Sequence, residues 1–129
     1  MVIDSSAIIA ILQAEPERQA YIEAISSVNY RNMSAVSFVE TSLVLVSRYG
    51  AKAMQEIDNF IGKAQIRIRS VDENQALIAR KAFLEFGKGR HSAQLNFGDC
   101  FAYALAKGLD QPLLFKGEDF SKTDVKIIQ

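Results

Sequence analysis

Residues 1–12, MVIDSSAIIAIL, decide the class of fold. Val2-Ile3 is the short apolar start expected of a buried strand, and Ser5-Ser6 is typical of the residues that begin a helix. The apolar run after these serines predicts a helix that follows the strand directly. A strand that passes straight into a helix indicates an α/β protein. Asp4 stands at the junction, at the carboxyl end of the expected strand.

The same alternation of strands and helices continues along the chain. Because parallel strands joined by helical crossovers carry helices on both faces, it predicts an α/β/α sandwich around a mostly parallel sheet of four or five strands. Residues 87–92 contain two glycines and no periodicity, so they predict a mobile loop that continues to residues 96–98. The spacing of apolar residues predicts further helices over 16–28, 36–49, 53–61, 72–86 and 96–108 and strands over 30–33, 66–71 and 112–115, with an edge strand at 125–128.

Length and composition predict one domain over residues 1–129, since 129 residues that are 49% hydrophobic suffice for one core. No apolar run approaches the roughly 20 residues that span a bilayer, and the acid at position 4 comes too early for a signal peptide. We therefore expect a soluble, cytoplasmic protein without a membrane segment. The 15 basic and 15 acidic residues cancel, so the net charge gives no reason to expect non-specific nucleic-acid binding. The single cysteine, Cys100, excludes an intrachain disulfide, and its apolar surroundings favour packing over catalysis.

Glu40 is a carboxylate on the expected apolar stripe of its helix, between Val36 and Leu43. An unpaired buried carboxylate costs several kcal/mol, so a neighbouring group must compensate it. A buried salt bridge to Arg48 or a capping-box contact with Ser37 would each do so.

Three more acids, Asp4, Asp99 and Asp119, stand beside apolar segments, where each alone is explained by helix capping or an Asx turn. The expected topology nevertheless brings them and Glu40 to one edge of the sheet, where ligands bind in α/β folds. Clustered carboxylates raise one another's pKa unless a cation neutralises them, and oxygen ligands favour Mg²⁺ or Mn²⁺. With His91 as the sole histidine, neither a zinc site nor a Ser-His-Asp triad is expected. Metal-assisted phosphoryl chemistry is the natural reaction class.

Four motifs together resemble a known family: VIDSSA at residues 2–7, VE at 39–40, LNFGDC at 95–100 and LLFKGEDF at 113–120. In order and spacing they are similar to those of PIN-domain ribonucleases, specifically the VapC toxins of bacterial type II toxin–antitoxin systems. The resemblance covers the whole chain. It implies a PIN-like fold, a Mg²⁺- or Mn²⁺-dependent endoribonuclease acting on RNA, a homodimer, and inhibition by a VapB-type antitoxin whose C-terminal segment lies along the helices and obstructs the site.

The resemblance also implies roles for individual residues. Asp4 and Asp99 match the direct metal ligands of the family. Glu40 and Asp119 would hold metal-bound waters or help to activate the nucleophile. The residues that match polar groups orienting the site are Ser6 and Asn96.

One position departs from the family, and two features have more than one explanation. Gly117 stands where many relatives have Thr or Ser, which removes a hydroxyl near the metal and leaves open how Asp119 is held. Lys88, Arg90 and His91 would contact RNA phosphates or form a solvated loop. The apolar residues of the first four helices would form either ordinary core or a groove for an antitoxin or a second subunit.

Two rival classes of protein remain. A phospho-receiver domain needs an acceptor aspartate, for which Asp72 is the only candidate, although it is better explained as a helix cap. A haloacid-dehalogenase-type phosphatase needs a second aspartate two residues after Asp4, where this chain has Ser6. The other rival, a catalytically silent PIN scaffold that only binds a partner, is disfavoured by the presence of all four acids.

Overall fold

A short parallel sheet lies at the centre of the structure, a computed structural model that describes residues 1–128. The strands run parallel in the order β3-β2-β1-β4, so β1 is central. This confirms the predicted parallel α/β sheet, with four strands. The strands are β1 (Val2–Ile3), β2 (Asn32–Ser34), β3 (Arg67–Arg69) and β4 (Leu113–Leu114).

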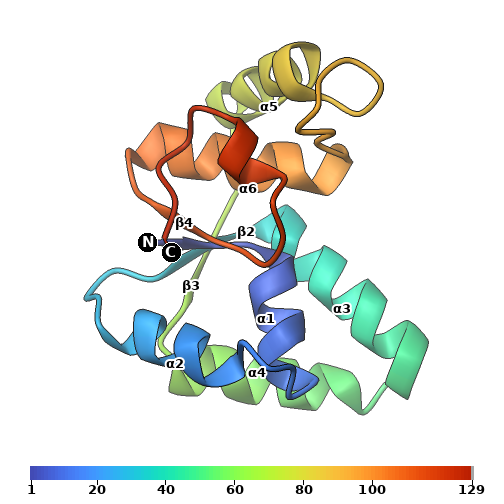
Figure 1. Cartoon of the computed structure of the whole chain (residues 1–129). Coiled ribbons are helices and arrows are strands. Elements are labelled where there is room, and N and C mark those ends of the chain that lie inside the picture. Colours follow the sequence, from blue (N-terminus) through green and yellow to red (C-terminus); the bar gives the residue numbers. More distant parts are fainter. Residues whose placement is uncertain (129) are drawn as a thin grey trace.

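Two groups of helices cover the two sides of the sheet (Figure 1). Helices α1 to α4 form the layer below the sheet in this view, and α5 and α6 form the layer above it. Within residues 1–128, no helix combines the length and the hydropathy needed to cross a membrane. The helices are α1 (Ser5–Leu12), α2 (Arg18–Ser26), α3 (Ala35–Tyr49), α4 (Ala53–Lys63), α5 (Glu73–Phe86) and α6 (Phe97–Leu109), and a 3-10 turn, η1 (Phe120–Lys122), follows β4.

The core is divided by the sheet, because successive side chains of a strand point to opposite faces. Val2 and Leu113 belong to the cluster packed beneath α5 and α6. Ile3 and Leu114, the next residues along the same strands, belong to the cluster packed against α1 and α2. The two residues of β1 and the two of β4 are therefore enough to join both layers.

Side-chain caps set the starting points of four helices. Asp4 caps α1, Ser34 caps α3, Asp72 caps α5 and Asn96 caps α6. The predicted cap at Asp72 is confirmed. Helix α6 has Asn96 as its cap, which agrees with the start predicted for the helix over 96–108. Asp4 directly follows β1, and Ser34 is the last residue of β2, so local capping chemistry places the starts of α1 and α3 at the carboxyl edge of the sheet.

The prediction of an edge strand over residues 125–128 is wrong. The segment forms a single parallel bridge, between Leu113 and Ile127. The backbone N–H of Leu113 donates to the carbonyl of Lys126 at 2.8 Å, and the N–H of Ile128 donates back to Leu113 at 3.1 Å. Because β4 has only two residues, it offers this segment one partner and no continuing ladder.

Helix α3 presents a different face to the core from the one predicted. Val39 and Leu43 are 51% and 65% exposed, whereas Ser37 and Thr41 are fully buried. The Thr41 hydroxyl donates to the carbonyl of Ser37 at 2.8 Å, which satisfies it inside the core. Glu40 therefore lies at the boundary between a buried polar face and an exposed apolar one, and not on a buried apolar stripe.

Helix α6 gives the fold its most sensitive position. Leu105 is fully buried and belongs to the cluster between α6, α5 and the sheet. We expect Leu105→Ala to lower the free energy of unfolding by about 2–5 kcal/mol, since it removes buried methyl groups and leaves a cavity. Denaturant unfolding followed by circular dichroism measures this. Leu84→Ala, at a position of α5 that is 61% exposed, is the control, and an equal loss in both variants would contradict the assignment of the core.

Candidate active site

Asp4 joins the end of β1 to the start of α1 and is almost fully buried. The backbone N–H and the hydroxyl of Ser6 both donate to its Oδ2, at 3.0 and 2.6 Å. Its other oxygen, Oδ1, is buried and has no hydrogen-bond partner among the described residues. Burial raises the pKa of Asp4 to about 6 in spite of the bonds from Ser6. An unpartnered buried carboxylate oxygen is what a bound cation would satisfy.

Glu40 reaches the same edge of the sheet from α3. The hydroxyl of Ser5 donates to its Oε1 at 2.6 Å. Its Oε2 lies against Gly98, where an added Cβ would stand 2.2 Å from this oxygen. Of the partners weighed for Glu40, Arg48 forms no ion pair with it in the described chain, and the Ser37 hydroxyl has no hydrogen-bond partner there. The Glu40 carboxylate is thus bonded to the start of α1 through Ser5 and packs against the first turn of α6 at Gly98.

Asp99 forms a capping box with Asn96 at the start of α6. The N–H of Asp99 donates to the Asn96 side chain at 2.9 Å, and the N–H of Asn96 donates to Asp99 Oδ2 at 3.0 Å. Burial first, and then the charges of Asp4, Glu40 and Asp119, raise the pKa of Asp99 to about 7, although the bond from the N–H of Asn96 lowers it. Asp99 is therefore both a helix cap and a member of a group of mutually repelling acids.

Asp119 comes from the segment between β4 and η1 and is exposed. In the described part of the chain its side chain makes no capping hydrogen bond, so the alternative of plain capping does not apply to it. Its charge raises the pKa of Asp99, which places it on the same side of the sheet edge. Gly117, with φ +109°, makes the turn that leads to it.

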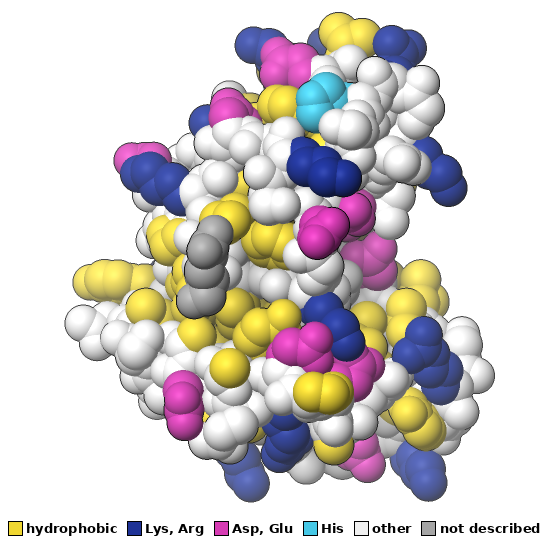
Figure 2. Space-filling view, viewed as in Figure 1, with side chains coloured by type: hydrophobic (Ala, Val, Ile, Leu, Met, Phe, Trp, Pro, Cys, Tyr) yellow, Lys and Arg dark blue, Asp and Glu magenta, His cyan; other side chains and the backbone are white. Residues whose placement is uncertain are grey.

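These acids were predicted to meet, and the structure brings them to one edge of the sheet. On the face shown in Figure 2, acidic side chains gather near the boundary between the two helical layers. Within residues 1–128, however, no three acidic, histidine or cysteine side chains converge closely enough to form a complete ligand set. The donors fit a hard cation that keeps several waters, as Mg²⁺ does, and Asp4 Oδ1 is the oxygen most clearly in need of one.

The basic residues predicted to contact RNA lie in the loop between α5 and α6. Lys88 and Arg90 are exposed. His91 is partly buried: its Nδ1 accepts from the N–H of Ala93 at 3.0 Å, and its ring packs edge-on against Phe86 at 5.2 Å. No hydrogen bond links the three to the acids in the described chain, so their contact with RNA stays a prediction.

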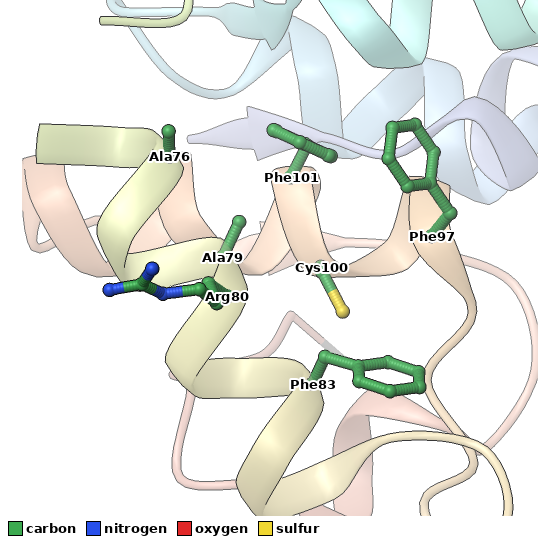
Figure 3. Close-up of a pocket in the computed structure, with 7 residues that line it drawn as sticks. All are labelled: Ala76, Ala79, Arg80, Phe83, Phe97, Cys100 and Phe101. Atoms are coloured by element: carbon green, nitrogen blue, oxygen red, sulfur yellow. The ribbon is translucent and has the colours of Figure 1, made fainter. Parts of the chain in front are cut away.

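Cys100 faces away from the acids, into an apolar cavity of about 340 Å³ between α5 and α6. Figure 3 shows its sulfur pointing toward Phe83. Burial and the charge of Asp99 raise the pKa of Cys100 to about 11, so the thiol stays protonated at neutral pH. This agrees with the expectation that Cys100 packs and takes no part in catalysis.

Sequence reasoning missed three residues that shape the site. Ser5 was assigned only to the helix start, yet it holds Glu40. Gly98 lies where a side chain would strike Glu40. Lys116 donates its backbone N–H to the Ser6 hydroxyl at 2.9 Å. All three belong to the motifs quoted above, but their partners lie 35 or more residues away in the sequence, and no local pattern signals such contacts.

The chain matches known proteins over nearly its whole length. A family model described as the PIN domain matches residues 1–126. Ribonuclease VapC of Mycolicibacterium smegmatis is 48% identical over 128 residues, which cover 99% of each chain. The chain belongs to the PIN-domain family of VapC ribonucleases. The resemblance drawn from the four VapC motifs is thereby confirmed.

Solved structures of VapC proteins have the same fold as this VapC-family chain. VapC20 of Mycobacterium tuberculosis, described as a sarcin-ricin loop cleaving toxin, superposes with a TM-score of 0.78 at 16% identity, covering 96% of this chain and 95% of that one. VapBC-1 of nontypeable Haemophilus influenzae superposes with a TM-score of 0.76 at 16% identity, covering 99% and 96%. At such identities the likeness shows the fold alone.

The crowding of the acids predicts how stability depends on pH. The pKa of Asp99 is about 7 in the folded chain against an ordinary 3.8, so the folded state binds this proton more tightly. The stability gained from the proton is lost as pH rises between those two values. We therefore expect metal-free Asp99→Asn to melt roughly 5 °C above the unsubstituted chain at pH 8, with the difference shrinking toward pH 4.

Differential scanning calorimetry in the presence of a chelator measures this difference. Asp58→Asn, which changes an exposed acid of α4, is the matched control and should show no such pH dependence. A lower melting temperature for Asp99→Asn at pH 8 would mean that the acids are not crowded.

Proposed function

We propose that this chain is the toxin of a type II toxin–antitoxin pair and acts as a Mg²⁺- or Mn²⁺-dependent endoribonuclease that hydrolyses RNA phosphodiester bonds. The observation that carries the proposal is the buried Oδ1 of Asp4, which has no hydrogen-bond partner within residues 1–128. Three further acids come to the same edge of the sheet, and their charges together with burial raise the pKa of Asp99. A bound cation would relieve both costs. Membership of the VapC ribonucleases supports RNA as the substrate.

Asp4 and Asp99 are the residues that would hold the cation. Asp4 offers its unpartnered Oδ1, while Ser6 fixes the other oxygen. Asp99 offers the oxygen that its capping box with Asn96 does not use. A divalent cation bound there supplies Lewis acidity, which acidifies water and neutralises charge on the phosphate.

Glu40 and Asp119 have the properties of groups that orient water and take up its proton. Glu40 is fixed by Ser5 at Oε1, which leaves Oε2 without a donor on the Gly98 side. Asp119 is exposed and makes no capping bond, so it is open to solvent and substrate. The two carboxylates approach the site from different elements, which allows one to receive a proton while the other positions the attacking water.

The rival chemistries find less support. Asp72 caps α5 by accepting the N–H of Gln75 at 2.8 Å and is exposed, which is the geometry of a cap and not of a buried phospho-acceptor. Ser6, at the position where a phosphatase would need its second aspartate, is committed to Asp4. A catalytically silent scaffold would have no reason to keep four repelling carboxylates together.

The exposed apolar surface supports a protein partner. Val39, Leu43 and Phe97 are 51%, 65% and 73% exposed, and they line a cavity of about 570 Å³ that also reaches Glu40. Contiguous exposed apolar surface of this kind is typical of interaction sites. The Haemophilus neighbour is described as VapBC-1, and we infer that a VapB-type antitoxin also binds this chain. That the chain also forms a homodimer is part of the same proposal.

The nuclease assignment is tested by Asp99→Asn. We expect cleavage of structured RNA in the presence of Mg²⁺ to fall by about a hundredfold or more, because one of two metal-holding carboxylates is lost. Gel assays of the purified chain measure the rate, with EDTA as the metal-free arm. Asp58→Asn should cleave normally. Undiminished cleavage by a folded Asp99→Asn would sink the assignment.

The antitoxin assignment is tested in cells. We expect expression of the chain to arrest growth, and co-expression of a small protein encoded beside its gene to relieve the arrest. Co-purification of the two proteins should accompany the relief, because binding and not repression of expression is the proposed cause. Arrest that no neighbouring product relieves would count against the toxin–antitoxin assignment.

A further inference from the structure

Lys116 ties the segment after β4 to two distant parts of the chain. Its ammonium contacts the carboxylate of Glu15 and lies 3.4 Å from that of Glu17, both in the turn between α1 and α2. Its backbone N–H donates to the hydroxyl of Ser6 at 2.9 Å, and this hydroxyl donates to Asp4 Oδ2 at 2.6 Å. A continuous chain of contacts therefore leads from the two glutamates to the most buried acid of the site.

The same segment carries Asp119. On its far side the backbone is held by bonds from the N–H of Ser121 to Glu118 at 3.1 Å and from that of Lys122 to Asp119 at 3.4 Å. On its near side, Gly117 makes a turn with a φ of +109° and has open space where a Cβ would stand. Phe120 anchors the far end, since it is buried and its ring packs edge-on against that of Phe115 at 5.1 Å. On the near side, Phe115 is also buried, and Lys116 adds the ion pairs and the bond to Ser6, so Asp119 stands between two anchored points.

We propose that Lys116 is a positioning residue: held by Glu15 and Glu17, it fixes the Ser6 hydroxyl on Asp4 and places Asp119 at the catalytic edge. The inference rests on the proposed nuclease function, whose geometry it completes. It also answers how Asp119 is held although Gly117 provides no hydroxyl. The ion pairs of Lys116 with the turn between α1 and α2 replace the local hydrogen bond that a hydroxyl at position 117 would make.

A direct contact between Lys116 and RNA is the competing role, and the local charge disfavours it. One ammonium faces two carboxylates, so the three groups together carry a net negative charge, which repels phosphate. The hydrogen bond that Lys116 donates to Glu15 raises the pKa of Lys116, as expected of a cation that is paired within the protein. The ammonium is therefore engaged by the chain itself.

The exposure of this cluster makes the proposal testable without unfolding the protein. The Lys116 side chain is 38% exposed, and exposed ion pairs contribute little to folding stability. We expect Lys116→Ala to keep its melting temperature within about 2 °C, while kcat falls about tenfold and KM stays within about twofold, because position and not binding is lost. The affinity for Mn²⁺, measured by calorimetry on the RNA-free protein, should fall severalfold because Asp4 is no longer fixed.

Exchanging the charges of Lys116 and Glu15 is the decisive test of the positioning role. Lys116→Glu should be at least as impaired as Lys116→Ala, and Lys116→Glu combined with Glu15→Lys should regain most of the lost kcat, since it restores an alternating trio with Glu17. Lys126→Ala is the matched control: it removes an exposed lysine paired with Asp110 at 2.9 Å, in the turn beyond the far end of α6. This variant should behave as the unsubstituted chain does.

Several outcomes would overturn the proposal. A raised KM with normal kcat in Lys116→Ala, or a charge exchange that restores nothing, would assign Lys116 to RNA contact. If the unsubstituted chain cleaves no RNA, the nuclease proposal fails, but the positioning role is still decided by hydrogen exchange and Mn²⁺ affinity. Lys116→Ala should speed amide hydrogen exchange in residues 116–119 relative to Lys126→Ala. Unchanged hydrogen exchange together with unchanged Mn²⁺ affinity would refute the positioning role of Lys116.

Discussion

The burial of Asp4 at the end of a two-residue strand is the constraint on which the rest of the structure depends. A carboxylate that is 2% exposed must be compensated, and the chain compensates only one of its two oxygens, through Ser6 at the start of α1. The other oxygen has no hydrogen-bond partner within residues 1–128. Burial raises the pKa of Asp4, and the nearby charge of Glu40 raises it further. The fold thus leaves one buried carboxylate, that of Asp4, in need of a positive charge, and the other acids lie near it.

The two helical layers contribute differently to this point. The layer of α1 to α4 supplies Asp4 and Glu40 and joins them through adjacent serines, Ser5 and Ser6. The layer of α5 and α6 supplies Asp99, whose capping box makes the start of α6 rigid. Gly98 lets the α6 backbone approach Glu40 more closely than any side chain would permit. The site therefore exists only where the layers meet, and the short strands of the sheet are what hold them in register.

The elements that could be predicted from sequence are those governed by local chemistry. The passage from Ile3 to Ser5 and the cap at Asp72 depend on neighbouring residues, and both were placed correctly. The buried face of α3 was misjudged, because periodicity reveals an apolar stripe but not whether protein or partner covers it, as Val39 shows by its exposure. The prediction of an edge strand at 125–128 failed for a related reason. Strand pairing there depends on the length of β4, which the sequence of residues 125–128 does not reveal.

The sequence was enough to predict that the four acids lie at one edge of the sheet, but not which residues hold them there. Carboxylates are conspicuous in apolar surroundings, whereas a lysine that holds a loop looks like any other surface charge. Lys116 pairs with Glu15 across 101 residues, and only the parallel order of β1 beside β4 brings them together. The same topology places the Lys116 amide on Ser6, two residues after Asp4. The proposed role of Lys116 adds no buried charge to the site. Its ammonium is partly exposed, while its backbone amide bonds to Ser6, so the segment that carries Asp119 can be held without further crowding of the acids.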